Sequence, residues 1–301
     1  MRTRLAPVVL LLLGLSACGE PAEVKVESTV DRPYDGPMYI KPDFSDRATA
    51  RERSGAAGRA LECAGEPYEG GGGDYVDGGL ESVQSDAREA LENYQDEAGL
   101  LDVPRDGYVV ERVEADRVLF SFDVDERTKV AYIAADGIRD SDDDVGWGIE
   151  SWASCDPSEF PAAVTEDLGI RVWHDQEGEP VPVSTITHYP GPEHCGWQDI
   201  TFLSLGDGRT QYLSDRDGEF AGPGLLTTTD DGHAVLPEDA TDTGYEYDNW
   251  HLWLAADRDA AYIVDVDDPS QVERWPAGPR SSSRVASSAT TSPAIASWST
   301  G

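Results

Sequence analysis

The sequence predicts an α+β fold in which one helix packs on an antiparallel meander, followed by a mostly β second half. Three observations favour this fold class. Apolar residues recur at helical spacing before residue 98, short strand-like runs separated by tight turns fill residues 108–154, and further strand-like runs continue after residue 170. Strands joined by short turns pair as antiparallel hairpins, and an amphipathic helix buries its apolar face against such a sheet.

The helix is expected over residues 85–98. Its apolar positions share the spacing of one helix face and are Leu80, Val83, Ala87, Leu91, Tyr94 and Ala98. Ser85 is the expected N-cap, Asp86 and Glu89 lie in the first turn, and Gly99 stands where a glycine often ends a helix. The single apolar face indicates that this helix covers a flat surface.

Four strands should follow the helix and form the meander. They are expected at Tyr108–Val113, Val118–Val124, Lys129–Ala135 and Trp147–Ser154. One helix across such a sheet resembles the cystatin-like or NTF2-like α+β layer, a likeness of architecture only. Before the helix, Gly70–Gly73 is interpreted as a flexible turn or as tight backbone packing, because the Lys-Ser/Thr pair of a phosphate-binding loop is missing.

The second half should begin after a short helix within Phe160–Gly169. Its strands are expected at Arg171–Asp175, Val181–His188, Asp199–Leu205, Gln211–Ser214, Trp250–Ala255 and Ala260–Val266. Leu236–Gly244 is interpreted as a loop or a single turn. The chain therefore divides into a tether at residues 18–60, an α+β domain at 61–160, a β-rich domain at 161–276 and a Ser/Ala/Thr-rich disordered tail at 277–301.

The first 18 residues resemble the leader of a bacterial lipoprotein. Arg2 and Arg4 form a basic start, residues 5–15 are apolar, and Leu15-Ser16-Ala17-Cys18 matches a lipobox. Such a run is too short to span a bilayer, which needs about 20 residues, but it fits a secretory signal peptide. The resemblance implies cleavage after residue 17, lipidation of Cys18, and a protein anchored on the extracytoplasmic face of the cell membrane.

Two further blocks are similar to segments of uncharacterised secreted lipoproteins of actinobacterial type. They are residues 151–160 and 191–197, and each contains one cysteine. This likeness implies a family without implying an activity.

The net charge narrows the choice of partners. The chain carries 59 acidic and 23 basic residues, a formal net charge of −36. A protein of this charge repels the phosphate backbone of nucleic acids, so nucleic acid is excluded as a partner. The acidic residues are expected to form a well-solvated surface.

Three cysteines remain besides Cys18, in a compartment where disulfides persist. A Cys155–Cys195 bond is favoured, because each cysteine adjoins a strand-like run and the closed loop is of moderate length. Cys63–Cys155 is the close alternative, since spacing alone proves neither pairing. Cys195 follows His194, but a structural disulfide is favoured over a thiol nucleophile. Spacings of the CxxC or HxxxH type are missing, which argues against zinc.

Asp140, Asp142 and Asp144 are the weak candidates for a metal site. They resemble the first half of an EF-hand calcium loop, but Val145 and Ser151 stand where that loop needs Gly and Glu. Solvated turns are favoured over calcium binding, because charge runs usually face water. The same interpretation covers a second acidic cluster, which contains Asp265, Asp267, Asp268 and Glu273.

No catalytic residue is assigned from the sequence. A Gly-x-Ser-x-Gly elbow is missing, and the five histidines share no ligand spacing. The sequence therefore favours a non-enzymatic binding or envelope-interaction module with an unknown protein or envelope partner. The alternatives are an extracellular carboxylate-based hydrolase, with or without calcium support, and a passive spacer.

Two structural observations would separate these hypotheses. A pocket that collects carboxylates of raised pKa would favour the hydrolase. An exposed aromatic patch would favour binding. The tryptophans that could form such a patch are Trp147, Trp152, Trp173, Trp197 and Trp250.

Overall fold

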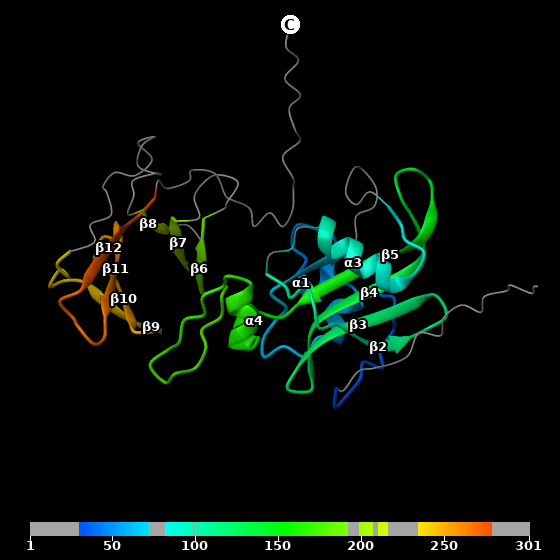
Figure 1. Ribbon diagram of the computed structural model, residues 1–301, viewed down its shortest axis with the longest axis horizontal. Coiled ribbons are helices and arrows are strands. Elements are labelled where there is room, and N and C mark those ends of the chain that lie inside the picture. Colours follow the sequence, from blue (N-terminus) through cyan, green and yellow to red (C-terminus); the bar gives the residue numbers. More distant parts are fainter. Residues whose placement is uncertain are drawn as a thin grey trace, which may run out of the picture.

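The computed structural model describes residues 30–72, 82–98, 100, 102–191, 199–206, 210–215 and 234–278. These residues form two parts that lie side by side (Figure 1), an N-terminal part at residues 30–169 and a C-terminal part at residues 170–278. The expected leader, Cys18, Gly99 and Cys195 lie outside the described residues. None of the helices in the described ranges is both long and apolar enough to cross a membrane.

A five-stranded antiparallel sheet forms the N-terminal part. Its strands are β1 (Glu69–Gly72), β2 (Val109–Val113), β3 (Arg117–Val124), β4 (Arg127–Arg139) and β5 (Val145–Ser154), in the order β1-β5-β4-β3-β2. Strands β2 to β5 pair consecutively, so the expected meander is confirmed. Side chains alternate along β4, where Val130 and Tyr132 enter one core and Ala131 and Ile133 the other.

Gly70, Gly71 and Gly72 of the glycine run belong to the edge strand β1, which the sequence did not predict. It pairs with β5. A Cβ atom on Gly70 would collide with Ser54 Oγ and lie 2.7 Å from the Trp152 carbonyl oxygen. Of the two interpretations offered for this run, tight backbone packing therefore holds at Gly70.

Helix α3 (Ala87–Glu97) covers one face of the sheet, as expected. It buries Leu91 and Tyr94 in a core that also contains Tyr132. Its N-cap is Asp86 rather than the predicted Ser85, because Asp86 has extended backbone and its carboxylate accepts hydrogen bonds from the amides of residues 88 and 89.

The opposite face is covered by the segment predicted as a tether. Helices α1 (Ala50–Arg53) and α2 (Ala57–Ala60) lie here. The residues that pack from this segment against β3, β4 and β5 are Met38, Ala56, Ala57, Ala60 and Leu61. From Met38 onward the tether prediction is therefore wrong. Small alanines give this segment no apolar stripe in the sequence, yet they let its backbone approach the sheet closely.

A short helical segment connects the two parts. It contains the 3-10 helix η1 (Pro157–Glu159) and helix α4 (Ala162–Asp167). Phe160, Val164 and Leu168 pack against the core beneath α3. The boundary predicted after residue 160 consequently falls near Ile170.

The C-terminal part is mostly β, as expected, and contains two antiparallel sheets. The first has β9 (Thr241–Tyr247), β10 (Trp250–Leu254), β11 (Ala260–Asp265) and β12 (Val272–Pro276), and the second has β6 (Ile186–Pro190), β7 (Thr201–Leu205) and β8 (Gln211–Ser214). Both sheets contribute to one core, through Leu203 and Tyr212 from one and Leu252 and Ile263 from the other. A bridge between Tyr212 and Ala277 also joins them.

Four predictions for this half need correction. The strand expected at Val181–His188 begins only at Ile186, where β6 starts, and residues 181–185 form a loop and turn. The segment Arg171–Asp175 is not a strand and makes only isolated bridges through His174. Strand β9 begins within Leu236–Gly244, which was interpreted as a loop or turn. Strand β12 occupies residues 272–276, for which the sequence predicted no strand.

Candidate functional site

Cys155 is bonded to Cys63, so the favoured Cys155–Cys195 pairing is wrong and the close alternative is correct. Strand β4 explains the pairing. The Glu62 amide donates to the Thr128 carbonyl, and the Cys155 amide donates to the neighbouring Lys129 carbonyl. Two segments 92 residues apart in the sequence are thereby brought side by side.

An ion pair between the buried Lys129 and the half-buried Glu159 lies against this disulfide. Lys129 Nζ lies 2.6 Å from Glu159 Oε2 and donates to the Glu62 carbonyl, while the same Glu159 oxygen accepts from the Ala64 amide. Among the described residues, Cys63, Cys155 and Glu159 are the one group with three ligand atoms close enough for a metal ion. Both sulfurs are already bonded to each other, so this group is structural.

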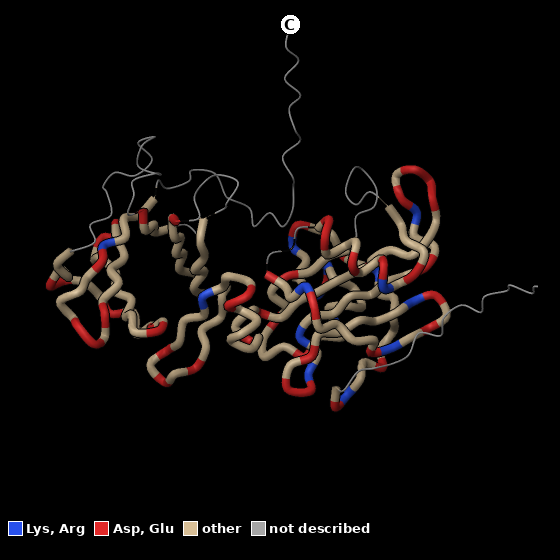
Figure 2. Tube along the Cα trace, viewed as in Figure 1, with Lys and Arg blue, Asp and Glu red and all other residues tan. Residues whose placement is uncertain are grey.

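Acidic residues concentrate in the loops and turns of both parts (Figure 2). Asp140, the first residue of the candidate calcium loop, is buried and accepts hydrogen bonds from the backbone amides of Asp142, Asp144 and Val83. Its carboxylate therefore closes a turn. Asp140, Asp142 and Asp144 do not converge into a metal-ligand group in the described structure.

The second acidic cluster uses its first aspartate in the same way. Asp265 Oδ1 accepts from the amides of Asp267 and Asp268, and Asp265 Oδ2 accepts from the Asn249 side chain. In both acidic clusters the first aspartate therefore holds a turn.

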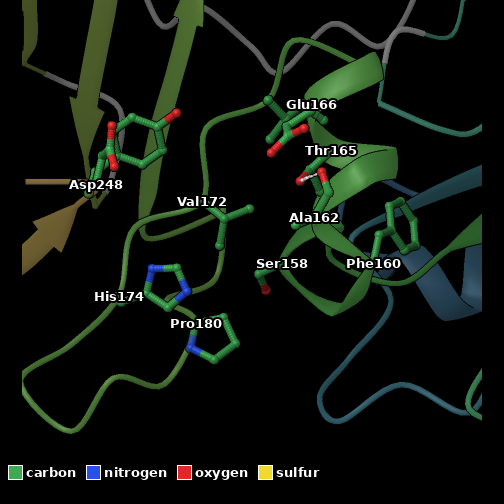
Figure 3. Close-up of a pocket in the computed structure, with 11 residues that line it drawn as sticks. Ser158, Phe160, Ala162, Thr165, Glu166, Val172, His174, Pro180 and Asp248 are labelled. Carbon is green, nitrogen blue, oxygen red and sulfur yellow. Dashed lines mark hydrogen bonds between the residues drawn. The ribbon is translucent and has the colours of Figure 1, made fainter.

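The candidate functional site is a pocket of about 450 Å³ where the two parts meet (Figure 3). One wall comes from η1 and α4, another from the segment 170–180, and a third from the turn between β9 and β10. Its lining consists of Ser158, Phe160, Ala162, Thr165, Glu166, Ile170, Val172, His174, Pro180, Tyr247 and Asp248. None of these residues was singled out as a binding residue from the sequence, because they come from three separate segments.

Asp156 fixes the junction on which the pocket depends. Its Oδ1 accepts from the Ser158 amide at 3.0 Å and the Val183 amide at 2.8 Å, and its Oδ2 accepts from the Ser184 amide at 3.2 Å. One carboxylate therefore begins η1 and also holds the C-terminal part. Ser158 is placed at the pocket wall as a result.

The far wall is fixed by backbone pairing. His174 and Glu246 exchange both backbone hydrogen bonds, at 2.7 and 2.9 Å. This pairing brings Tyr247 and Asp248 beside the segment that carries Val172. The Tyr247 ring packs against Trp173, so it is held in place from behind.

The pocket has an apolar floor and a polar rim. Phe160 and Ile170 are buried at the floor, while Glu166, His174 and Asp248 are exposed. The buried Thr165 hydroxyl donates to the Ala162 carbonyl. Lining of this kind binds small ligands by apolar contact and orients them by a few polar groups.

The carboxyl groups of raised pKa lie elsewhere. Burial raises the pKa of Glu69 and of Asp102, and the charges of Asp102 and Asp156, respectively, raise them further. Burial also raises the pKa of Glu111, whose carboxylate accepts from the Tyr34 amide and the Thr128 hydroxyl. None of these three groups lines the pocket.

An exposed tryptophan patch is also not seen in the described ranges. Trp152 and Trp173 are buried, Trp147 and Trp250 are half-buried, and Trp197 lies outside the described residues. Neither observation that was expected to separate enzyme from binding module is therefore present in its simple form.

Comparison with known proteins identifies no relative of this chain. No family model matches the chain, and neither a curated protein nor a solved structure gives a match.

Proposed function

We propose that the protein is an extracytoplasmic lipoprotein, anchored through lipid on Cys18, that acts as a non-enzymatic binding module. The lipobox-like leader supports the anchoring. The observation that carries the binding function is the pocket at the junction of the two parts, whose volume of about 450 Å³ falls within the usual range for small-molecule sites. The helix across the meander also supports a cystatin-like or NTF2-like layer as the scaffold.

The alternative, a carboxylate-based hydrolase, gains less support. A general acid must reach a bound substrate. The carboxyl groups whose pKa is raised in the described structure, Glu69, Asp102, Glu111 and Asp259, all lie outside the pocket lining. Within the described structure, no hydrogen bond joins the Ser158 hydroxyl to the His174 imidazole, as a nucleophile and its base would need.

The pocket assignment is tested by screening small fragments against the full mature chain by NMR. Fragments should shift the methyl signals of Ile170 and Val172. The variant Val172→Trp fills the pocket from its half-buried wall and should abolish the shift of the Ile170 methyl signals, whereas Val235→Trp, at an exposed position outside the pocket, should leave the shifts of Ile170 and Val172 unchanged. Fragments that bind both variants equally would contradict the assignment.

The anchoring is tested separately by mass spectrometry of the native protein. The expected N-terminus is a lipid-modified Cys18, and Cys18→Ser should release the protein from the membrane fraction. A native protein with residues 1–17 still attached, or with an unmodified Cys18 thiol, would overturn the proposal.

A further inference from the structure

We propose that the pocket binds an amphipathic organic cation. Its ammonium group would lie at the rim between Glu166 and Asp248, and its apolar portion would rest on Phe160, Ile170 and Val172. This inference rests on the proposed binding function and adds the chemical class of the ligand.

The rim of the pocket carries negative charge and no Lys or Arg. Glu166 lies on α4 and Asp248 on the opposite wall (Figure 3), while the lining contains no Lys or Arg. The nearest arginine in the sequence, Arg171, places Nη1 2.9 Å from His188 Nε2 inside the C-terminal part and so does not neutralise the rim. Together with the net charge of −36, this arrangement attracts cations and repels anions.

The floor of the pocket is apolar. Phe160 and Ile170 are buried, Val172 is half-buried, and the Thr165 hydroxyl hydrogen is already used by the Ala162 carbonyl. The half-buried Tyr247 adds an aromatic ring to the wall beside Asp248, where it can contact a cation through its face. An apolar portion is therefore required to fill the site, and a small hydrated cation would leave the floor unoccupied.

A bound divalent metal fits this arrangement less well. In the described structure, neither Glu166 nor Asp248 belongs to a group of three oxygen, nitrogen or sulfur ligands close enough to share one ion. An organic ammonium needs no such convergence of three ligands, because its N–H groups can donate hydrogen bonds to two carboxylates that lie on opposite sides of it.

The test compares probes with the same hexyl chain and different head groups. Hexylammonium, 1-hexanol and hexanoate are titrated into the full mature chain, with the methyl signals of Ile170 and Val172 as the readout. Hexylammonium should bind about fivefold tighter than hexanol for each rim carboxylate that it engages, and hexanoate should bind most weakly. Methylammonium, which lacks the apolar chain, should not shift these methyl signals.

Matched variants separate the rim from the general field of the protein. The double variant Glu166→Gln, Asp248→Asn should reduce hexylammonium binding to the level of hexanol and leave hexanol unchanged. Asn suits residue 248, which has a φ of +56°. The control Asp167→Asn removes one charge from the same helix outside the lining and should change the affinity less than twofold.

The outcomes distinguish the ligand class from the site itself. If hexanol binds as tightly as hexylammonium, or if Asp167→Asn has the same effect as the double variant, the cation proposal is overturned while the pocket stands. If none of the three hexyl probes shifts the methyl signals, the proposed binding function falls together with its ligand class.

Discussion

The two parts of the molecule bury their polar groups in opposite ways. In the N-terminal part the disulfide and the Lys129–Glu159 ion pair lie at the ends of the interior strands β4 and β5, in a sheet that is packed on both faces. In the C-terminal part a histidine, His188, lies in an aromatic core formed by Trp173, Tyr247 and Trp275. One part should therefore respond most to reduction and the other to acid.

The neutral state of His188 explains its place in that core. Burial, and secondly the charge of Arg171, lowers the pKa of His188 to about 3. Its Nδ1 accepts a hydrogen bond from Trp173 Nε1 at 3.0 Å. An uncharged imidazole can thus join an aromatic cluster that a protonated one would disrupt.

Removal of the disulfide should have the largest effect on stability. Cys63→Ser with Cys155→Ser releases a loop whose ends are 92 residues apart, which should cost about 4–5 kcal/mol of unfolding free energy by the loop-closure model. Guanidinium unfolding followed by hydrogen exchange should show the loss in peptides from α3 and β4. Peptides from β10 and β11 should be affected less.

The single variant Cys195→Ser provides the matched control. It should leave the exchange of α3 and β4 unchanged, because Cys155 is bonded to Cys63. If Cys195→Ser instead caused the same loss of protection, the Cys155–Cys195 pairing would be supported over Cys63–Cys155. If both parts lost protection equally, the contrast between them would not hold.

Lowering the pH should have the second-largest effect on stability, and the effect should be opposite in sign in the two parts. The pKa of His188 is about 3 in the folded state against 6.5 for an unperturbed imidazole, so the unfolded state takes up the proton first. The stability that neutral His188 contributes is therefore present above pH 6.5 and is lost as the pH falls towards 3. At about pH 4.5 the loss should be roughly 2–3 kcal/mol.

The N-terminal part contains groups with the opposite linkage. Because the pKa values of Glu69, Asp102 and Glu111 are raised, their contribution is fully present below their unfolded pKa and is lost as the pH rises through the folded pKa. Hydrogen exchange between neutral pH and about pH 4.5 should thus show protection falling in β10 and β11 relative to α3. His188→Gln should flatten this dependence, whereas the exposed His174→Gln should not.

The Asp156 carboxylate, which joins η1 to residues 183–184, should contribute less to stability. In Asp156→Asn one side-chain oxygen can still accept from Ser158 and Val183, but the new amide meets the Ser184 amide donor to donor. The expected cost is about 1–2 kcal/mol. Faster exchange at residues 183–184 would check it, and the control Asp175→Asn, in a turn within the C-terminal part, should leave these residues unchanged.

Local patterns explain which elements could be predicted. The apolar positions of α3 and the alternation in β2 to β5 are visible within each segment, and these elements form close to where the sequence indicates. Strand β9 was missed because Thr241–Tyr247 is polar, nowhere fully buried, and interrupted by Gly244 at a φ of +74°. Strand β12 has only five residues and ends in a proline.

The disulfide and the pocket depend on information that no single segment holds. Cys63 meets Cys155 because both adjoin neighbouring residues of β4, and sequence spacing does not encode that register. The pocket needs Asp156 to hold residues 183–184 and His174 to pair with Glu246. A cluster of Asp residues, in contrast, is visible in the sequence and yet serves turns in both parts.

The smallest effect should come from those turns, where the two parts are alike. Asp140→Ala removes an acceptor from three backbone amides and Asp265→Ala from two amides and one side-chain amide. Each change should cost about 1 kcal/mol, with the larger loss at the buried Asp140. The corresponding Asn variants keep one acceptor oxygen and should recover part of it. Thermal unfolding should give the same melting temperature with and without millimolar calcium, because these carboxylates already serve backbone amides. A calcium-dependent rise in the melting temperature that Asp140→Ala abolishes would instead support a calcium site at Asp140. The two turns would then differ in function.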